Sequence, residues 1–197
     1  MPDGRVAVTA GGDGDGSIRT WNPKTGECTA TIAAGHLSHS PDGVTCIAFA
    51  GDGTTVVTGG VDGSVVVSNI ASGKRVAHVR EHADSVEGVA FANGLPLVVT
   101  ASMDGKVIIW DTNAASKRGT CEHPEGVVHL AMQHRGPLFA TACLDGAVRV
   151  FDVRTAQSVA TLGGHTAPVQ CVAWAPDDVH LLSGSDDHTA RVFQCPA

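Results

Sequence analysis

One short pattern recurs along this chain and constrains its fold more than any other feature. Its first copy, GGDGDGSIRTWN over residues Gly11–Asn22, places an aspartate-containing glycine turn before an alternating, β-branched stretch. Such alternation after a tight turn is typical of a β-strand. Four further copies have the same shape, and they read VDGSVVVSN (61–69), MDGKVIIWD (103–111), LDGAVRVFD (144–152) and DDHTARVFQ (186–194). The chain is therefore built from repeats that each contain this turn and strand.

The acidic, glycine-rich start of the pattern raises two alternatives to a simple turn. A calcium loop beginning at Asp13 needs a carboxylate at its twelfth position, and that position is Lys24. A phosphate-binding loop needs Lys-Ser/Thr and a helix after its glycines, whereas a strand-like stretch follows here. The turn interpretation is the one that the recurrence supports.

The spacing of the repeats identifies their class. Five aligned positions near the strand ends follow one another at intervals of 47, 42, 41 and 42 residues, namely Trp21, Ser68, Trp110, Phe151 and Phe193. A period of roughly 40 to 45 residues with four strands per unit resembles the WD40 repeat, although only Trp110-Asp111 has the eponymous dipeptide. The resemblance implies an all-β fold, an incomplete WD40 β-propeller with about four and a half blades of a seven-bladed ring.

The whole chain, 1–197, is predicted to be a single propeller segment. Its blades are expected at about 5–32 (partial), 44–79, 85–121, 126–162 and 168–195 (partial). The first lacks its innermost strand and the last its outermost strand, so we expect the N-terminus to be cut and the C-terminus to be natural. The most apolar strands, such as VTCIAFA and VQCVAWA, are expected to be buried between neighbouring blades.

Composition excludes several classes of function. The apolar content of 43% suffices for a core, and no apolar run approaches the ~20 residues of a membrane span. Six scattered cysteines without a CxxC pair predict buried thiols in a reducing compartment, with no metal and no cofactor. The net charge of −7 disfavours nucleic acid and suits basic partners. We expect a cytoplasmic protein, with the nucleus as a second location, and neither a membrane nor a small-molecule substrate as partner.

A recurring set of His, Thr or Ser, and Asp side chains has the composition of a catalytic triad. Because catalysis needs one such site, a copy in each unit points to scaffolding, and we predict that the protein is not an enzyme and has no catalytic residues. In WD40 proteins the matching residues form buried hydrogen-bonded tetrads. The resemblance places them at His82, Thr100, Asp104 and Trp110, at His123, Thr141 and Asp145, and at His165, Ser183 and Asp187.

Charge is predicted to differ in sign between the two faces of the propeller. The loops before the innermost strands and the Asp-Gly turns are acidic, and the remaining turns are mainly basic. An acidic face attracts cationic segments, with a solvated surface as the alternative. The predicted partner-binding residues are Asp42, Asp84, Glu87, Met103, Glu125, Leu144 and Asp186.

The second half of the chain has a closer resemblance. CEHPEGVVHL (121–130), TACLDGAVRVFDVRT (141–155) and GSDDHTARVFQC (184–195) resemble the family of angio-associated migratory cell protein and its fungal ribosome-assembly counterpart. That resemblance implies a chaperone whose acidic face captures a basic segment of a large-subunit ribosomal protein. The alternative is a general WD40 scaffold in a signalling, ubiquitin-ligase or ciliary complex.

Overall fold

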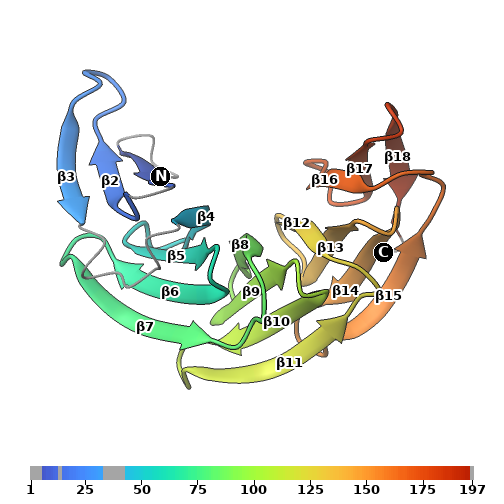
Figure 1. The fold of residues 1–197 in the computed structure, drawn as a ribbon, viewed down its shortest axis with the longest axis horizontal. Helices are drawn as coiled ribbons and strands as arrows, with labels where there is room; N and C mark the ends of the chain where they lie inside the picture. Colours follow the sequence, from blue (N-terminus) through green and yellow to red (C-terminus); the bar gives the residue numbers. More distant parts are fainter. Residues whose placement is uncertain (1–5, 13–14, 33–42, 196–197) are drawn as a thin grey trace. The chain divides into compact units, whose positions relative to one another are not determined.

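The computed structural model describes residues 6–12, 15–32 and 43–195, which form strands, turns and loops with no helix among them. Their eighteen strands form five antiparallel sheets of three, four, four, four and three strands in chain order (Figure 1). The all-β class predicted from the sequence is therefore confirmed. Within the described residues no helix is long and apolar enough to cross a membrane.

The chain divides within β8 (Val86–Phe91) into two compact units, Met1–Val89 and Ala90–Ala197. In the first unit, β1–β3 form one sheet and β4–β7 the next. These strands are β1 (Ala7–Ala10), β2 (Ile18–Trp21), β3 (Cys28–Ile32), β4 (Val44–Phe49), β5 (Thr55–Gly60), β6 (Ser64–Asn69) and β7 (Lys74–Arg80).

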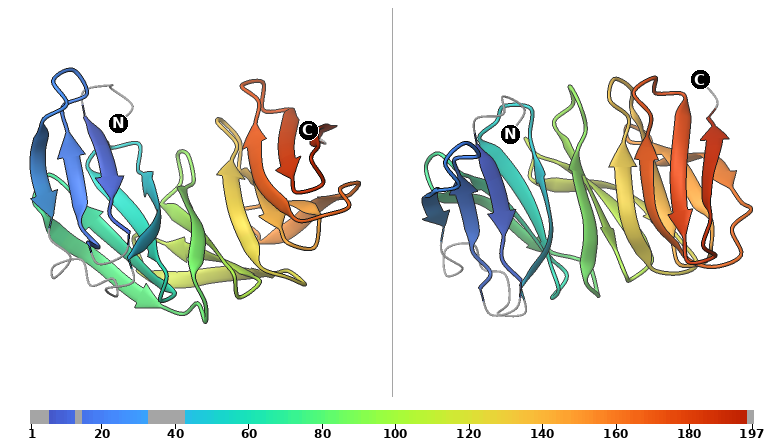
Figure 2. Two further views of the ribbon diagram at one scale, coloured as in Figure 1. Left: turned by 45° about the horizontal axis from the view of Figure 1, so that its top comes forward. Right: turned by 90° about the horizontal axis from the view of Figure 1, so that it is seen from above.

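The second unit contains the strands that follow β8 in its own sheet, and two further sheets, β12–β15 and β16–β18 (Figure 2). In every sheet the strands lie in chain order, so short turns suffice to connect them. The strands are β9 (Leu97–Ser102), β10 (Lys106–Asp111), β11 (Ser116–Glu122), β12 (Val127–Met132), β13 (Leu138–Cys143), β14 (Val148–Asp152), β15 (Gln157–Leu162), β16 (Val169–Trp174), β17 (His180–Ser185) and β18 (Ala190–Gln194).

Burial varies systematically across each four-stranded sheet. The second strands are the most buried: all six residues of β9 are buried, as are five of six in β5 and in β13. The first strands β4, β8 and β12 are apolar but only partly buried, which corrects the expectation that they would be the buried ones. Since a second strand has a neighbour on each side within its sheet, only its two faces remain to be covered. The last strands, such as β7, are mainly exposed.

Apolar side chains from neighbouring sheets form the cores. In the first unit, Ile18, Ile32, Val56 and Val66 pack together between the β1–β3 and β4–β7 sheets. In the second unit, one cluster contains Phe139, whose ring stacks on that of Phe151 with 5.3 Å between centroids. A second cluster joins the β12–β15 and β16–β18 sheets, and contains Ala140, Ala142, Val148, Val150, Val169, Val172, Trp174, Leu181 and Cys195.

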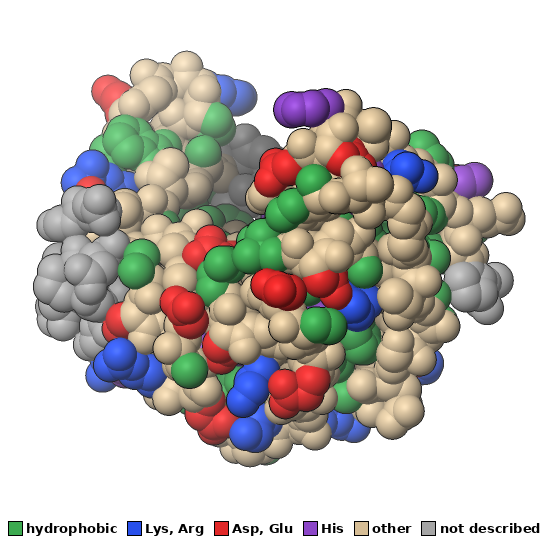
Figure 3. All heavy atoms as spheres, turned by 45° about the vertical axis from the view of Figure 1, so that its right-hand side comes forward, with side chains coloured by type: hydrophobic (Ala, Val, Ile, Leu, Met, Phe, Trp, Pro, Cys, Tyr) green, Lys and Arg blue, Asp and Glu red, His purple; other side chains and the backbone are tan. Residues whose placement is uncertain are grey.

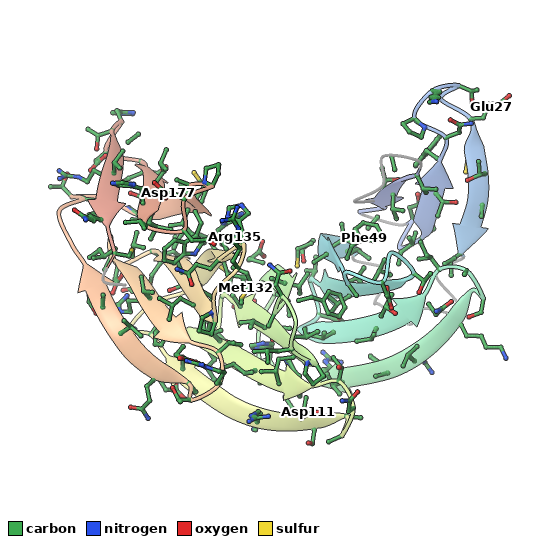
Figure 4. The ribbon with its side chains drawn as sticks, turned by 180° about the vertical axis from the view of Figure 1, so that it is seen from behind. Glu27, Phe49, Asp111, Met132, Arg135 and Asp177 are labelled. Atoms are coloured by element: carbon green, nitrogen blue, oxygen red, sulfur yellow. The ribbon has the colours of Figure 1, made fainter. Side chains whose placement is uncertain are left out.

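The turns between first and second strands of the second unit are linked by side-chain hydrogen bonds. The Asn93 amide donates to the carbonyls of Gln133 and His134, both at 3.1 Å. The Asp178 carboxylate in turn accepts from the backbone N–H groups of His134 and Arg135, at 2.8 and 2.9 Å. Figure 4 labels Arg135 and Asp177, which lie in two of these turns. These hydrogen bonds link neighbouring sheets, and no sequence pattern had predicted them.

The Asp-Gly turns require glycine for two reasons. Gly63 has φ +77°, a left-handed conformation, and a Cβ there would lie 2.5 Å from the carbonyl oxygen of His82. The chain therefore passes close to a backbone atom that a side chain could not avoid. Gly73 has a similar φ of +67°, but a Cβ on it would meet nothing within 4 Å.

Alanine variants of Gly63 and Gly73 separate the effect of the left-handed backbone from that of the close approach to a carbonyl. Gly73→Ala should lower the free energy of unfolding by about 1 kcal/mol, from the left-handed backbone alone. Gly63→Ala should lower it by a further ~1–3 kcal/mol, because the methyl group displaces a backbone carbonyl. Urea denaturation of both variants measures the difference, and equal losses would show that the close approach does not matter.

Candidate functional site

The Asp-Gly turns and the loops before the first strands come together in the second unit. A Cβ on Gly105 would lie 3.0 Å from the carbonyl oxygen of His123, and one on Gly146 would lie 3.2 Å from that of Ala167. The Leu144 N–H donates to the Gly126 carbonyl at 2.9 Å, and the Asp186 N–H donates to the Pro168 carbonyl at 3.0 Å. Turns 103–105, 144–146 and 186–188 thus adjoin loops 123–126 and 165–168, and we call this surface the turn face.

Four predicted binding residues lie on the turn face. Met103 packs over Gly126, where an added Cβ would be 3.1 Å from its sulfur, and Leu144 bonds to the same glycine. Met103 and Leu144 are half-buried, while Glu125 and Asp186 are exposed. Figure 3 shows acidic and hydrophobic side chains next to one another on the surface in view. The turn face therefore offers both carboxylates and apolar contact area.

The other three predicted binding residues belong to the first unit. Asp84 is exposed and Glu87 half-buried; Ser85 donates its backbone N–H to Asp84 at 2.7 Å and its hydroxyl to Glu87 at 2.5 Å. Asp42 lies outside the described residues. A surface that these residues share with the turn face is a prediction from the sequence.

We call each recurring group of His, Ser or Thr, and Asp a polar set. In the polar set of the β16–β18 sheet, His165 bonds to both of its predicted partners. Nδ1 of His165 lies 2.8 Å from Oδ2 of Asp187, and its Nε2 lies 2.7 Å from the Ser183 hydroxyl. The Thr189 hydroxyl and backbone N–H also donate to Asp187, at 2.6 and 2.9 Å. Hydrogen bonds from Thr189, supplemented by His165 and the Thr166 N–H, hold the pKa of Asp187 well below its ordinary value.

The matching set of the β12–β15 sheet is arranged differently. Nε2 of His123 lies 2.9 Å from the Thr141 hydroxyl, and its buried Nδ1 makes no hydrogen bond with a carboxylate. Asp145 instead binds the Arg149 guanidinium through both oxygens, at 3.1 and 2.5 Å. Burial, reinforced by the Arg149 charge, lowers the pKa of His123 to about 4. The predicted link between His123 and Asp145 is therefore not made.

In the β8–β11 sheet, the Trp110 indole donates to the Thr100 hydroxyl at 2.9 Å, as the WD40 resemblance implies. His82 is buried, and Asp104 accepts the Lys106 backbone N–H at 2.9 Å. Sequence reasoning missed the corresponding pair in the first sheet, where the Trp21 indole donates to the Thr9 hydroxyl at 2.9 Å. The signal was a threonine on the strand before the strand that ends in Trp21 or Trp110.

The described residues give little support for other chemistry. Among them no group of three or more His, Cys, Asp or Glu side chains is placed to hold a metal ion. All six cysteines are free; Cys121, Cys143 and Cys195 are buried, and Cys28 and Cys171 are exposed. Desolvation raises the pKa of Cys46 and Cys121 to about 11, so both stay protonated at neutral pH and are poor nucleophiles.

Four consecutive segments match the family model described as "WD domain, G-beta repeat", namely residues 26–67, 73–111, 116–152 and 156–194. Together they cover most of the chain. Each segment begins at the last strand of one sheet and ends at the third strand of the next sheet. The sequence repeat is therefore offset from the sheets, and each repeat contains strands of two consecutive sheets. No curated protein matches the chain, and the finer resemblance to angio-associated migratory cell protein therefore has no relative behind it.

The scaffold interpretation of the polar sets predicts the effect of His165→Ala. Ser183 and Asp187 would each lose a buried partner, so the free energy of unfolding should fall by ~1–3 kcal/mol. Thermal denaturation measures this loss. The same substitution at exposed His78 is the control and should change stability by less than ~0.5 kcal/mol.

The neutral state of His123 predicts a pH dependence of stability. Its folded pKa of about 4 lies below the ordinary value of 6.5, so the unfolded chain binds more protons between these values. Stability should thus rise with pH through this window and fall by up to about 3 kcal/mol as pH drops from 6.5 to 4. His123→Gln should flatten that part of the profile relative to wild type, while His78→Gln should not.

Proposed function

The chain belongs to the WD40-repeat family, and from this premise we propose that it is a protein-binding module without catalytic activity. WD40 domains are generally non-catalytic modules that bind other proteins. The turn face supplies such a surface in the second unit. The polar sets are repeated from sheet to sheet and their partners are mostly internal, which supports a scaffolding role for them.

The observation that carries the proposal is the pairing of exposed carboxylates with apolar contacts on the turn face. Glu125 and Asp186 are exposed, and Met103 and Leu144 lie half-buried beside the same glycine. A lysine or arginine side chain fits this combination, because its aliphatic stem covers apolar surface while its charge meets a carboxylate. The proposed partner is therefore a flexible, basic segment of another protein.

Several contacts must act together for such binding to be useful. Each exposed ion pair contributes only ~0.2–1 kcal/mol, so the affinity must come from multiple carboxylates and the apolar pair. Outside this surface, the same unit has exposed Lys117 and Arg118 on strand β11 and exposed Arg135 and Arg154 in turns. A cationic segment is therefore favoured at the turn face and disfavoured at the basic turns.

We extend the proposal to a ribosome-assembly chaperone that holds a basic segment of a large-subunit ribosomal protein. Its support is the sequence resemblance of residues 121–130, 141–155 and 184–195. The family match equally supports a general WD40 scaffold with another basic client. Peptides from the basic termini of large-subunit ribosomal proteins, compared with scrambled peptides of equal charge, separate these two functions.

Charge reversal tests the binding surface itself. Glu125→Lys combined with Asp186→Lys should weaken binding of a fluorescent Lys/Arg-rich peptide at least tenfold at about 0.1 M salt, measured by anisotropy. Wild-type binding should also weaken at about 1 M salt, where the Debye length falls from ~10 Å to ~3 Å. Melting curves check that the variant remains folded.

A matched control makes the same change in net charge elsewhere. Glu27→Lys with Asp177→Lys replaces two exposed carboxylates in turns outside the turn face (Figure 4). This variant should bind the peptide nearly as well as wild type. If both double variants lose affinity equally, net charge alone governs binding and the turn face is only a solvated surface.

A further inference from the structure

The β16–β18 sheet presents an exposed apolar surface on one side. Ala173, Leu182 and Val192 lie directly opposite one another on its three strands, so their side chains share one side of the sheet. All three are exposed, Leu182 by 43% and Val192 by 66%. We call these three residues the Leu182 face. An exposed apolar group of this kind commonly marks a contact with another protein surface.

The corresponding surface of the preceding sheet is covered. Ala140 pairs with Val150 in the β12–β15 sheet as Leu182 pairs with Val192 in the β16–β18 sheet. Ala140 and Val150 are fully buried, in a cluster that also contains Leu181 from the opposite side of the β16–β18 sheet. The cover at these positions is therefore the next sheet along the chain.

A second case in the same unit has the same order. Val99 and Ile109 pair at the corresponding positions of the β8–β11 sheet. They are buried in one cluster with Phe139 and Phe151, which belong to the second and third strands of the next sheet. In both cases the positions that match the Leu182 face pack against the opposite side of another sheet of the same kind.

The β1–β3 sheet has such an opposite side exposed. The Trp21 indole bonds to the Thr9 hydroxyl, and this bond matches the one between Trp110 and Thr100. Strands β1 and β2 therefore correspond to β9 and β10. Ala7 and Thr9 are exposed on β1, with Ala7 directly opposite Trp21, and we call Ala7, Thr9 and Trp21 the Ala7 face. The counterparts of Ala7 and Thr9 in the other sheets are at most 3% exposed, namely Val56, Val98, Phe139 and Leu181, and Thr58, Thr100, Thr141 and Ser183.

We propose that the Leu182 face of one copy of the chain binds the Ala7 face of a second copy, so that copies associate head to tail. The second copy is the occupant because the side of a sheet that fits the Leu182 face is exposed in this same chain. The Trp21 ring then packs on Leu182 and Val192, as Phe151 packs with the counterparts of these two residues in the β8–β11 sheet. Removal of apolar surface from water drives the contact.

This contact joins two different surfaces, so it continues beyond the dimer unless the assembly closes into a ring. Sedimentation velocity of the full chain over a wide range of protein concentration tests it. Wild type should form species heavier than the 20.1 kDa chain, in amounts that rise with concentration. Salt at about 1 M should not weaken this apolar contact, unlike peptide binding at the turn face. A monomer at every concentration would overturn the proposal.

Charges on the Leu182 face should prevent association. Leu182→Lys combined with Val192→Lys should raise the dissociation constant at least about tenfold. The matched control is Val159→Lys with Val76→Lys, because these side chains are 43% and 64% exposed on the last strands of other sheets. The control should associate like wild type, and melting curves check that both variants are folded. Equal loss in both would show that net charge governs association and would overturn the proposal.

The Ala7 face is changed separately. Ala7→Lys leaves the bond between Thr9 and Trp21 in place and should also weaken association at least about tenfold. Thr9→Lys alters the same face and replaces the first variant if that one does not fold. Self-association that persists in a folded variant of this face would contradict the proposed contact.

Mixing the two kinds of variant identifies which faces meet. Ala7→Lys retains an intact Leu182 face, and the Leu182→Lys, Val192→Lys variant retains an intact Ala7 face. Each alone should stay monomeric, whereas their mixture should form a dimer and nothing larger. If wild type associates but the mixture stays monomeric, like faces pair or sheet edges join, and the proposal is wrong. No peptide is used, so the result is independent of the function proposed for the turn face.

Discussion

The close approach of each Asp-Gly turn to the backbone of the following loop is the constraint on which the surface of this protein depends. Gly63, Gly105 and Gly146 all have positive φ, and a Cβ on any of them would lie 2.5 to 3.2 Å from a carbonyl oxygen of that loop. Because the loop leads into the first strand of the next sheet, this contact places two chain segments on one surface. Glycine permits this approach at these three turns, whereas His188, with φ +66°, holds the corresponding position of turn 186–188.

The polar sets next to these turns have similar residues but differ in the partner of the aspartate. His165, Ser183 and Asp187 form a complete network, whereas His123 makes no bond to Asp145, whose carboxylate binds Arg149 instead. The Asp145–Arg149 ion pair takes the place of the bond that Asp187 makes to His165, and its two side chains are only 17% and 15% exposed.

Sequence reasoning predicted the all-β fold class, which the structure confirms, but it did not predict which side chains become hydrogen-bond partners in the folded protein. Period and alternation indicated the all-β fold, because each strand carries its own signal. The same reasoning assigned Asp145 to His123, because motif matching does not show that Arg149 competes for the carboxylate. It also overlooked Thr9 as the partner of the Trp21 indole. The blade limits and the shared acidic surface of the two units remain predictions.

The sequence by itself determined the WD40 repeats, the turns that need glycine and the residue types available to each polar set, because these depend on local spacing and backbone conformation. Only the tertiary structure decided that second strands are the buried ones and that Asn93 and Asp178 link turns of different sheets. It also decided which cation or imidazole each aspartate meets. Those outcomes depend on competition among donors that lie far apart in the chain, and such competition is settled by distance in the folded protein.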